Sequence, residues 1–416
     1  MSNLWQASIP KDWTWKTVGE FTTDHKQGYY TKESYTSIGT YLIRITDLGN
    51  PKIDYSEMPR LAIDEKEFQQ FKVNIGDFLF ARSGAIGRYG IVAKNHPAVF
   101  ASYLIRFRFD ECSVFTRYFG YLYESDLCQK QLASITQGSS NININAENIK
   151  SLSVPFAPFP EQQKIAAILT VVDDVIESTQ AQINKLKDLK TGMMQELLTK
   201  GIGHTKFKDS PVGRIPANWD LKPLDMVVEQ IVDCEHKTAP YVEKSNYIVI
   251  RTNNVKCGQL VFDDIKYTTE DGYREWTGRL TPAAGDVLFT REAPAGESCM
   301  VPRNLKVCMG QRMVLLRPDK LIVDGEYFSL YLNSQTAIDS IFRFSIGTTV
   351  SRINIEDIRK IPCVIPALEE QRRISKSVNS VQISILALEE TLQKSENMKK
   401  ALMQDLLTGK VRVNLN

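Results

Sequence analysis

The sequence Glu161-Gln162-Gln163-Lys164-Ile165 begins a long stretch that recurs 209 positions later, where it reads Glu370-Gln371-Arg372-Arg373-Ile374. After each pentapeptide, apolar residues alternate four and three positions apart, which is the heptad pattern of a coiled-coil helix. The chain contains two such heptad stretches, and a globular segment separates them. We therefore predict two long helices that pack on each other within one molecule, in antiparallel directions. The heptad positions are Ile165, Leu169, Val172, Ile176, Ile183, Leu186, Met193 and Leu197 in the first copy and Ile374, Val378, Val381, Ile385, Leu388, Leu392, Leu402 and Leu406 in the second.

A lysine occupies the same heptad position in both copies, at Lys190 and Lys399. Such a lysine either lays its stem along the coil and keeps its ammonium group in water, or fixes the register of the helices through a polar contact. The first copy also has a second apolar stripe at Ile168, Val175 and Leu189, whereas the equivalent positions of the second copy are mostly small or polar. This stripe predicts an additional neighbour for the first helix.

The repeat extends beyond the heptads and gives a domain map. Ile9-Pro10-Lys11-Asp12-Trp13 returns as Ile215-Pro216-Ala217-Asn218-Trp219, and Gly76-Asp77-Phe78-Leu79-Phe80-Ala81-Arg82 returns as Gly285-Asp286-Val287-Leu288-Phe289-Thr290-Arg291. The chain is therefore built from two similar halves. The predicted boundaries are 1–158 for a first globular domain, 159–205 for the central long helix and linker, 206–366 for a second globular domain and 367–416 for the C-terminal long helix.

The residue pattern inside each globular domain indicates mixed α and β structure, so the predicted fold class is α+β. Residues 103–109 alternate as in a strand with one buried face. Residues 64–71 and 116–134 contain few β-branched residues and are predicted to be helices. The polar stretch that follows Gly201 and Gly203 and runs to Gly213 is predicted to be a linker.

Composition and charge exclude several classes of protein. The chain has 416 residues, 43% of them hydrophobic and 24% charged, which is ordinary for a globular protein of two or three domains. Its formal net charge of +2 gives no general attraction to nucleic acid, so local patches would have to supply it. The sequence has no leader-like N-terminus and no apolar run of membrane-spanning length, which predicts a cytoplasmic protein without a membrane segment. The seven cysteines have no framework-like spacing, and we predict neither disulfides nor structural zinc.

No catalytic constellation is present in the sequence. It lacks a phosphate-binding Gly-x-x-x-x-Gly-Lys-Ser/Thr loop, a Gly-x-Gly-x-x-Gly fingerprint and a His-Glu-x-x-His pair, and it also lacks the Asn/Asp-Pro-Pro-Tyr tetrapeptide of amino-methyltransferases. Cys234, His236 and Cys257 have no matched second pair, so their spacing is only a weak indication of a metal site. We expect no enzymatic activity, no cofactor and no metal.

Loops rich in arginine, hydroxyl and amide side chains are the candidates for a nucleic-acid interface, because these groups donate to phosphates and base edges. Two repeated features carry this prediction, the arginine that ends each Gly-Asp-x-Leu-Phe strand and the Gly-Ser/Thr-Ser/Thr turn. The polar loop 233–238 has only a loose counterpart near His25. For each loop the alternative is an ordinary solvated turn. The candidate residues are Arg82, Ser83, Arg88, Ser139, Ser140 and Asn141 in the first half and His236, Lys237, Thr238, Arg291, Thr348, Thr349 and Arg352 in the second.

The duplicated order of these motifs resembles the specificity subunit of type I restriction–modification enzymes over the whole chain. The resemblance implies two target-recognition domains that each read one part of a bipartite double-stranded DNA sequence, and an antiparallel coiled coil that sets their separation. It also implies that catalysis resides in partners, which are two modification subunits that methylate adenine and restriction subunits that cleave with ATP. The modification subunit is expected to bind the start of each long helix, at Glu161, Gln162, Gln163, Glu370 and Gln371.

Two other classes of protein are alternatives to this one. A non-catalytic coiled-coil scaffold, whose paired domains bind proteins or glycans, would agree with the near-zero net charge. A methyltransferase would need cofactor and catalytic motifs that the sequence lacks. The residues do not determine which bases are read, because side chains in loops do not fix the register of a protein in the groove.

Overall fold

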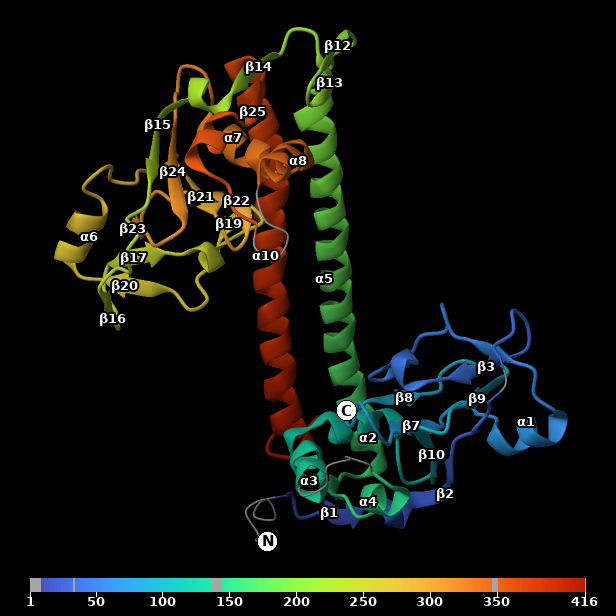
Figure 1. The fold of residues 1–416 in the computed structure, drawn as a ribbon. Coiled ribbons are helices and arrows are strands. Elements are labelled where there is room, and N and C mark those ends of the chain that lie inside the picture. The colour runs from blue at the N-terminus through green and yellow to red at the C-terminus, as the bar shows by residue number, and fades with distance from the viewer. Residues whose placement is uncertain (1–8, 33, 137–143, 346–350, 416) are drawn as a thin grey trace. The chain divides into compact units, whose positions relative to one another are not determined.

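The computed structural model describes residues 9–32, 34–136, 144–345 and 351–415, and Figure 1 shows their helices and strands. By their internal contacts they form two compact units. Unit 1 is Met1–Gln180 together with Glu390–Asn416, and unit 2 is Ala181–Glu389. Each unit therefore combines one globular domain with part of both long helices. Of the described residues, no helix is long and apolar enough to cross a membrane.

The globular part of unit 1 contains a four-stranded sheet in the order β2-β10-β7-β8, a three-stranded sheet in the order β6-β3-β9, and the pairs β1-β11 and β4-β5. Its strands are β1 Thr14–Thr17, β2 Thr22–Gln27, β3 Thr40–Ile43, β4 Leu48–Gly49, β5 Lys52–Ile53, β6 Arg60–Leu61, β7 Phe78–Ala81, β8 Tyr89–Ile91, β9 Ala98–Phe100, β10 Leu104–Phe109 and β11 Ser153–Phe156. Its helices are α1 Glu65–Phe71, α2 Thr116–Glu124, α3 Asp126–Thr136 and α4 Ala146–Lys150, with short 3-10 turns at Val18–Phe21 and Ile45–Asp47.

Unit 2 repeats this plan, with sheets in the orders β15-β24-β21-β22 and β16-β20-β17-β23 and the pairs β14-β25, β18-β19 and β12-β13. Its strands are β12 Phe207–Ser210, β13 Gly213–Pro216, β14 Asp220–Pro223, β15 Val228–Asp233, β16 Tyr241–Val242, β17 Tyr247–Ile250, β18 Val255–Lys256, β19 Gln259–Leu260, β20 Lys266–Thr268, β21 Val287–Arg291, β22 Ala295–Met300, β23 Lys306–Met309, β24 Met313–Pro318 and β25 Pro362–Ile365. Its helices are α6 Glu270–Trp276, α7 Gly325–Leu332, α8 Gln335–Phe344 and α9 Ile355–Arg359, with 3-10 turns at Leu224–Met226 and Thr252–Asn254.

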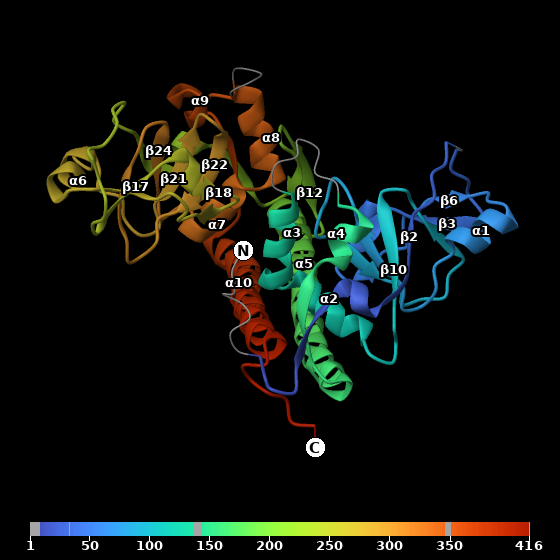
Figure 2. The ribbon, with the colours of Figure 1, turned by 90° about the horizontal axis from the view of Figure 1, so that it is seen from below.

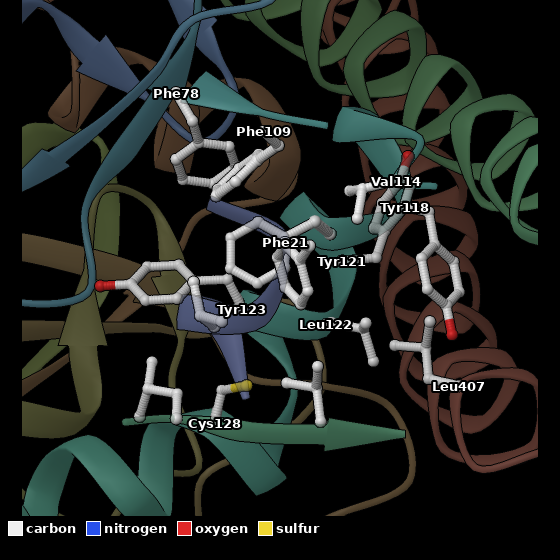
Figure 3. Close-up of a cluster of buried hydrophobic side chains, with 14 of the residues drawn as sticks. Phe21, Phe78, Phe109, Val114, Tyr118, Tyr121, Leu122, Tyr123, Cys128 and Leu407 are labelled. Carbon is white, nitrogen blue, oxygen red and sulfur yellow. The ribbon is translucent and has the colours of Figure 1, made fainter. Parts of the chain in front are cut away.

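Aromatic side chains dominate the core of unit 1. Phe78 stacks on Tyr89, with ring centroids 4.7 Å apart; Phe78 also lies against Phe119 and Tyr123 of α2, and Tyr89 lies against Tyr123. Figure 3 shows that Phe21, Phe78 and Phe109 belong to the same cluster, and that Leu407 of the C-terminal helix reaches it. The burial of this aromatic and aliphatic surface contributes most of the free energy that holds the strands against α2 and the long helices.

The two long helices are α5, Phe159–Lys200, and α10, Leu368–Leu407. In unit 1, Ile165 and Leu169 near the start of α5 share a core with Leu406 and Leu407 at the end of α10. In unit 2, Ile374 near the start of α10 shares a core with Leu198 at the end of α5. The start of each helix therefore packs with the end of the other, which confirms the predicted antiparallel pair.

The two lysines at equivalent heptad positions, Lys190 and Lys399, both make polar contacts, but with different partners. Lys399 Nζ lies 2.8 Å from Asp173 Oδ1 and 3.1 Å from Glu124 Oε2 in unit 1. Burial alone would lower the pKa of Lys399, but these carboxylates raise it above its ordinary value. In unit 2, Lys190 Nζ donates to the neutral Gln382 Oε1 (2.8 Å), and burial lowers the pKa of Lys190.

Helix α2 lies beside α5 in unit 1, as both views indicate (Figures 1 and 2). Arg117 and Tyr121 of α2 both contact Asp173 of α5, at 2.8 and 2.6 Å. Tyr121 also lies 3.1 Å from Thr170 of α5. Domain and helix are thus joined in unit 1 by a charged cluster as well as by apolar packing.

Several local predictions were wrong. The stretch 201–213 is not simply a linker, because β12 and β13 form a hairpin whose turn places Gly213 at a φ of 103°. Residues 116–134 are helical as predicted, although Ser125, which has extended backbone, divides them into two helices. The strand over 103–109 begins only at Leu104 and is buried on both faces, Arg106 included.

Candidate nucleic-acid interface

Arg82 and Arg291 occupy equivalent positions at the ends of β7 and β21. The backbone N–H of Arg82 donates to the carbonyl of Tyr103 (3.0 Å), and that of Arg291 donates to the carbonyl of Arg312 (2.9 Å). Their own carbonyls accept from Ile144 and Ile353, at 2.8 and 2.9 Å. These repeated contacts hold the same loop edge together in both units.

The side chains of the two arginines differ in burial and in ion pairing. Arg291 is only 8% exposed, and its Nη1 lies 2.5 Å from Asp233 Oδ2. Arg82 is half-buried, and in the described ranges it has no ion-pair partner. The reason is visible in the strand pairing: Asp233 lies opposite Val314, whereas the residue opposite the equivalent Ile105 is the neutral Gln27. The guanidinium of Arg291 is therefore used within unit 2, whereas among the described residues of unit 1 no carboxylate takes the place of Asp233 beside Arg82.

A cleft of about 260 Å³ opens at this edge of unit 2. We call it the arginine cleft, and its lining residues are His236, Arg291, Glu292, Gln311, Arg312 and Arg352. His236 and Arg312 are largely exposed, and Arg312 Nε lies 3.7 Å from Glu292 Oε2. Positive and hydrogen-bonding groups outnumber the single lining carboxylate, so the cleft suits a ligand that presents acceptors.

A cleft of about 440 Å³ opens at the equivalent edge of unit 1. We call it the tyrosine cleft, and its lining residues are Tyr29, Tyr30, Thr31, Lys32, Tyr35, Leu42, Arg44, Ile45, Thr46, Ala101, Ser102 and Tyr103. The equivalence follows from backbone contacts, since the N–H groups of Gly28 and Cys234 donate to the first residues of β10 and β24 (3.0 and 3.1 Å). Tyr30 therefore stands where unit 2 has His236, and Tyr103 stands where it has Arg312.

This alignment corrects one prediction and supplies residues that the sequence did not single out. The counterpart of loop 233–238 lies near Tyr30, not near His25, because His25 is inside β2 and stacks on Phe107. Among the described residues, no group of three His, Cys, Asp or Glu side chains is placed to hold a metal ion. Tyr30, Tyr103 and Arg312 belong to no recognisable sequence motif, and only the strand pairing of the folded chain shows that they line the clefts.

The other predicted DNA contacts lie on nearby loops. Lys237 is exposed and pairs with Glu275 at 3.3 Å, and Thr238 next to it is exposed. Arg88 is exposed, Ser83 is half-buried, and Arg352 is exposed at the arginine cleft. The remaining candidates, Ser139, Ser140, Asn141, Thr348 and Thr349, lie outside the described residues.

The residues predicted to bind a partner at the start of α5 are mostly internal. Glu161 is buried and accepts hydrogen bonds from Trp13 Nε1 (2.9 Å) and from Arg412 Nε and Nη2 (2.7 and 2.8 Å). Gln162 is buried too, and it bonds the backbone of Phe115, Ser113 and Ala157. The hydrogen bonds that Arg412 donates to the Glu161 and Asp12 carboxylates raise the pKa of Arg412.

Unit 2 repeats this arrangement at the start of α10. Glu370 accepts from Trp219 Nε1 (3.0 Å) and Ile202 N (3.0 Å), and it lies 2.7 Å from His204 Nε2. Gln371 is buried and bonds the backbone of Asp324, Ile322 and Pro366. The Glu-Gln pairs thus fasten each globular domain to its long helix, and their partner-binding role stays a prediction. Gln163 is exposed and stays a predicted partner contact.

Two duplicated domains, each with a cleft at equivalent strand ends and each fastened to antiparallel helices, define a protein built from two similar modules. The family described as type I restriction modification DNA specificity domain matches residues 10–188 and 219–395, and the chain belongs to this family. As a member, it is the non-catalytic DNA-recognition component of a type I restriction–modification complex. The alternative of a protein- or glycan-binding scaffold is not favoured.

Individual relatives agree with this assignment. The chain is 26% identical to a putative type I restriction enzyme MjaX specificity subunit of Methanocaldococcus jannaschii, over 98% of this chain and 95% of the relative. It is 23% identical to the EcoKI specificity subunit of Escherichia coli, over 96% and 88%. The crystal structure of a type I S subunit from M. genitalium has the same fold, with a TM-score of 0.64 at 14% identity over 96% of this chain and 97% of that one.

Proposed function

We propose that each globular domain contacts one half of a bipartite DNA target through its cleft and the loops around it. The observation that carries this proposal is the repetition of a cleft at equivalent strand ends, which Arg291 lines in unit 2 and which Arg82 adjoins in unit 1 through its hydrogen bond to Tyr103. Arginine, lysine and hydroxyl groups at such an edge supply donors to phosphates and base edges. Arg82, Ser83, Arg88 and the tyrosine cleft serve one half-site, and His236, Lys237, Thr238, Arg352 and the arginine cleft serve the other.

Arg291 has a supporting place in this proposal. Its ion pair with Asp233 fixes the end of β15, from which the loop with His236 begins. Its backbone also holds Arg312 through the hydrogen bond between Arg291 N and Arg312 O. We infer that Arg291 positions the cleft, while more exposed side chains reach the DNA.

The proposed partners are two modification subunits and, where present, restriction subunits, which act with this chain on DNA in the cytoplasm. Exposed apolar residues on α5, namely Val171 and Val175 in unit 1 and Leu189 in unit 2, favour a helical partner along this face. They include two positions of the second apolar stripe. Gln163 lies on the same helix and is also available to that partner.

The test is to express the chain with its modification subunits in a host that lacks other adenine methylation, and to sequence the methylated DNA. We expect one bipartite motif. Replacing residues 1–158 with the corresponding domain of a relative should change one half of this motif and leave the other intact. If both halves change together, or neither does, the assignment of one half-site to each domain is wrong.

A further inference from the structure

We propose that the equivalent residues Tyr103 and Arg312 determine which kind of base pair each domain reads. In this inference Arg312 reads a guanine in one half-site, and Tyr103 contacts the thymine of an A·T pair in the other. The inference rests on the proposed function and makes it specific for base chemistry.

Both residues stand at the same supported point of the fold. Each directly precedes an inner strand of a four-stranded sheet, β10 in unit 1 and β24 in unit 2. The carbonyl of each accepts a hydrogen bond from the strand arginine beside it, Arg82 or Arg291. The side chains nevertheless face solvent, with Tyr103 62% exposed and the Arg312 side chain 52% exposed. A rigid backbone with an exposed side chain is what base readout requires.

Arg312 presents an exposed guanidinium to the arginine cleft from a position that strand pairing fixes. Arg291 is held by Asp233, whereas the contact of Arg312 with Glu292 is long, at 3.7 Å. Arg312 also has a φ of 67°, an uncommon conformation for a residue with a side chain, which is compatible with a functional constraint. Its planar fork matches the O6 and N7 acceptors that guanine presents in the major groove.

The tyrosine cleft offers different chemistry at the equivalent point. Tyr103 is accompanied by Tyr30 and Tyr35, which are also largely exposed. The arginine that lines this cleft, Arg44, is bound to Asp47 through Nε and Nη2, at 3.1 and 2.8 Å. The exposed aromatic faces of Tyr30, Tyr35 and Tyr103 suit apolar contact with the C5-methyl group of thymine.

The experiment uses the full-length chain with its modification subunits and reads the methylated motif by sequencing. In Arg312→Ala, we expect one guanine of one half-site to become degenerate, and binding of the original site to weaken roughly 5- to 150-fold. Arg312→Lys should reduce the preference for guanine at the same base pair with little change in salt dependence, because lysine keeps the positive charge but lacks the planar guanidinium that bonds guanine through two N–H groups. Exchanging the domain 206–366 identifies which half-site unit 2 reads.

Two further variants complete the test. Tyr103→Arg should replace an A·T pair by a G·C pair, or lose preference there, in the half-site read by unit 1. Arg303→Ala, which removes an exposed arginine that does not line the arginine cleft, should leave the motif unchanged.

Three outcomes would overturn the inference: an unchanged motif in folded Arg312→Ala, a degenerate position that is not guanine, or a change in the half-site assigned to unit 1. Methylation without any bipartite motif by the unaltered chain would instead overturn the proposed function, and the inference with it.

Discussion

Replacing Glu161 with Gln should loosen the end of α10 and the start of α5 from the first globular domain. The Glu161 carboxylate accepts from Trp13 and twice from Arg412, and it is almost fully buried. A glutamine of the same shape keeps one acceptor but turns an NH₂ group toward donors. At least one buried donor then loses its partner, and the ion pair with Arg412 is lost.

The size of this effect follows from the exposure of the partners. The buried bond between Trp13 and a charged acceptor contributes about 1.5–3 kcal/mol. The side chain of Arg412 is 44% exposed, so its pair adds only about 0.2–1 kcal/mol. We therefore expect a loss of about 2–4 kcal/mol, which lowers the urea midpoint of unit 1 by about 1 M for a slope of about 3 kcal/mol per M.

Urea unfolding followed by circular dichroism measures the midpoint, and amide hydrogen exchange assigns the change to a unit. Faster exchange should appear in peptides around Trp13 and Arg412, and peptides around Trp219 should stay protected. Glu196→Gln is the matched control, because Glu196 lies on α5 with its side chain 59% exposed in an i,i+4 pair with Lys200. Its expected effect is within about 0.5 kcal/mol. An unchanged midpoint and unchanged exchange in Glu161→Gln would refute this account of the contact.

Three further predictions follow from other contacts. Arg82→Ala should weaken DNA binding without a change in the unfolding midpoint, whereas Arg291→Ala should destabilise unit 2 by about 1–3 kcal/mol because Asp233 loses its buried guanidinium partner; equal stability of the two variants would contradict this. Four-residue insertions in both long helices, after Gln180 and after Glu389, should add about 6 Å of helix and lengthen the spacer of the methylated motif by one or two base pairs, and an active variant with an unchanged spacer would count against the helices as the ruler. At pH 8 a thiol reagent should modify the exposed Cys112 and Cys257 and spare the other five cysteines until the chain is unfolded, because burial raises the pKa of Cys128, Cys299 and Cys308 to about 12; rapid labelling of all seven would disprove it.

The architecture could be predicted from the sequence because duplication and heptad spacing are local patterns. The heptad repeat from Ile165 and Ile374 onward predicts the two helices. Because a globular domain separates these two matching helices in the chain, they can pack on each other in antiparallel directions. The recurrence of Trp13 and Trp219 with Glu161 and Glu370 was also visible, but the bonds between them join residues 148 and 151 positions apart. Only the folded chain shows that each tryptophan donates to the glutamate of its own half.

The clefts were predicted less well, because their residues come from separate strand ends. Arg82 and Arg291 have the same motif, and their different surroundings depend on Asp233, which is 58 positions from Arg291 and reaches it through the neighbouring strand β24. Tyr103 was assigned to a strand by its alternation, yet it stands before that strand and faces solvent. No periodic signal marks such a position, since its exposure is set by where the strand pairing begins.

The discontinuous make-up of unit 1 has a consequence for its synthesis on the ribosome. Residues 1–180 need Leu406, Leu407 and Arg412 to complete their core and the contact with Glu161. At about 5–20 residues per second, translation of the intervening Ala181–Glu389 takes on the order of 10–40 s. The nascent chain therefore holds an unfinished first unit while the second, which is continuous in sequence, is made and can fold. A premature stop near the C-terminus would leave the first unit incomplete and exposed to proteases and chaperones. The residues lost would be the last to be translated, although they complete the unit that is translated first.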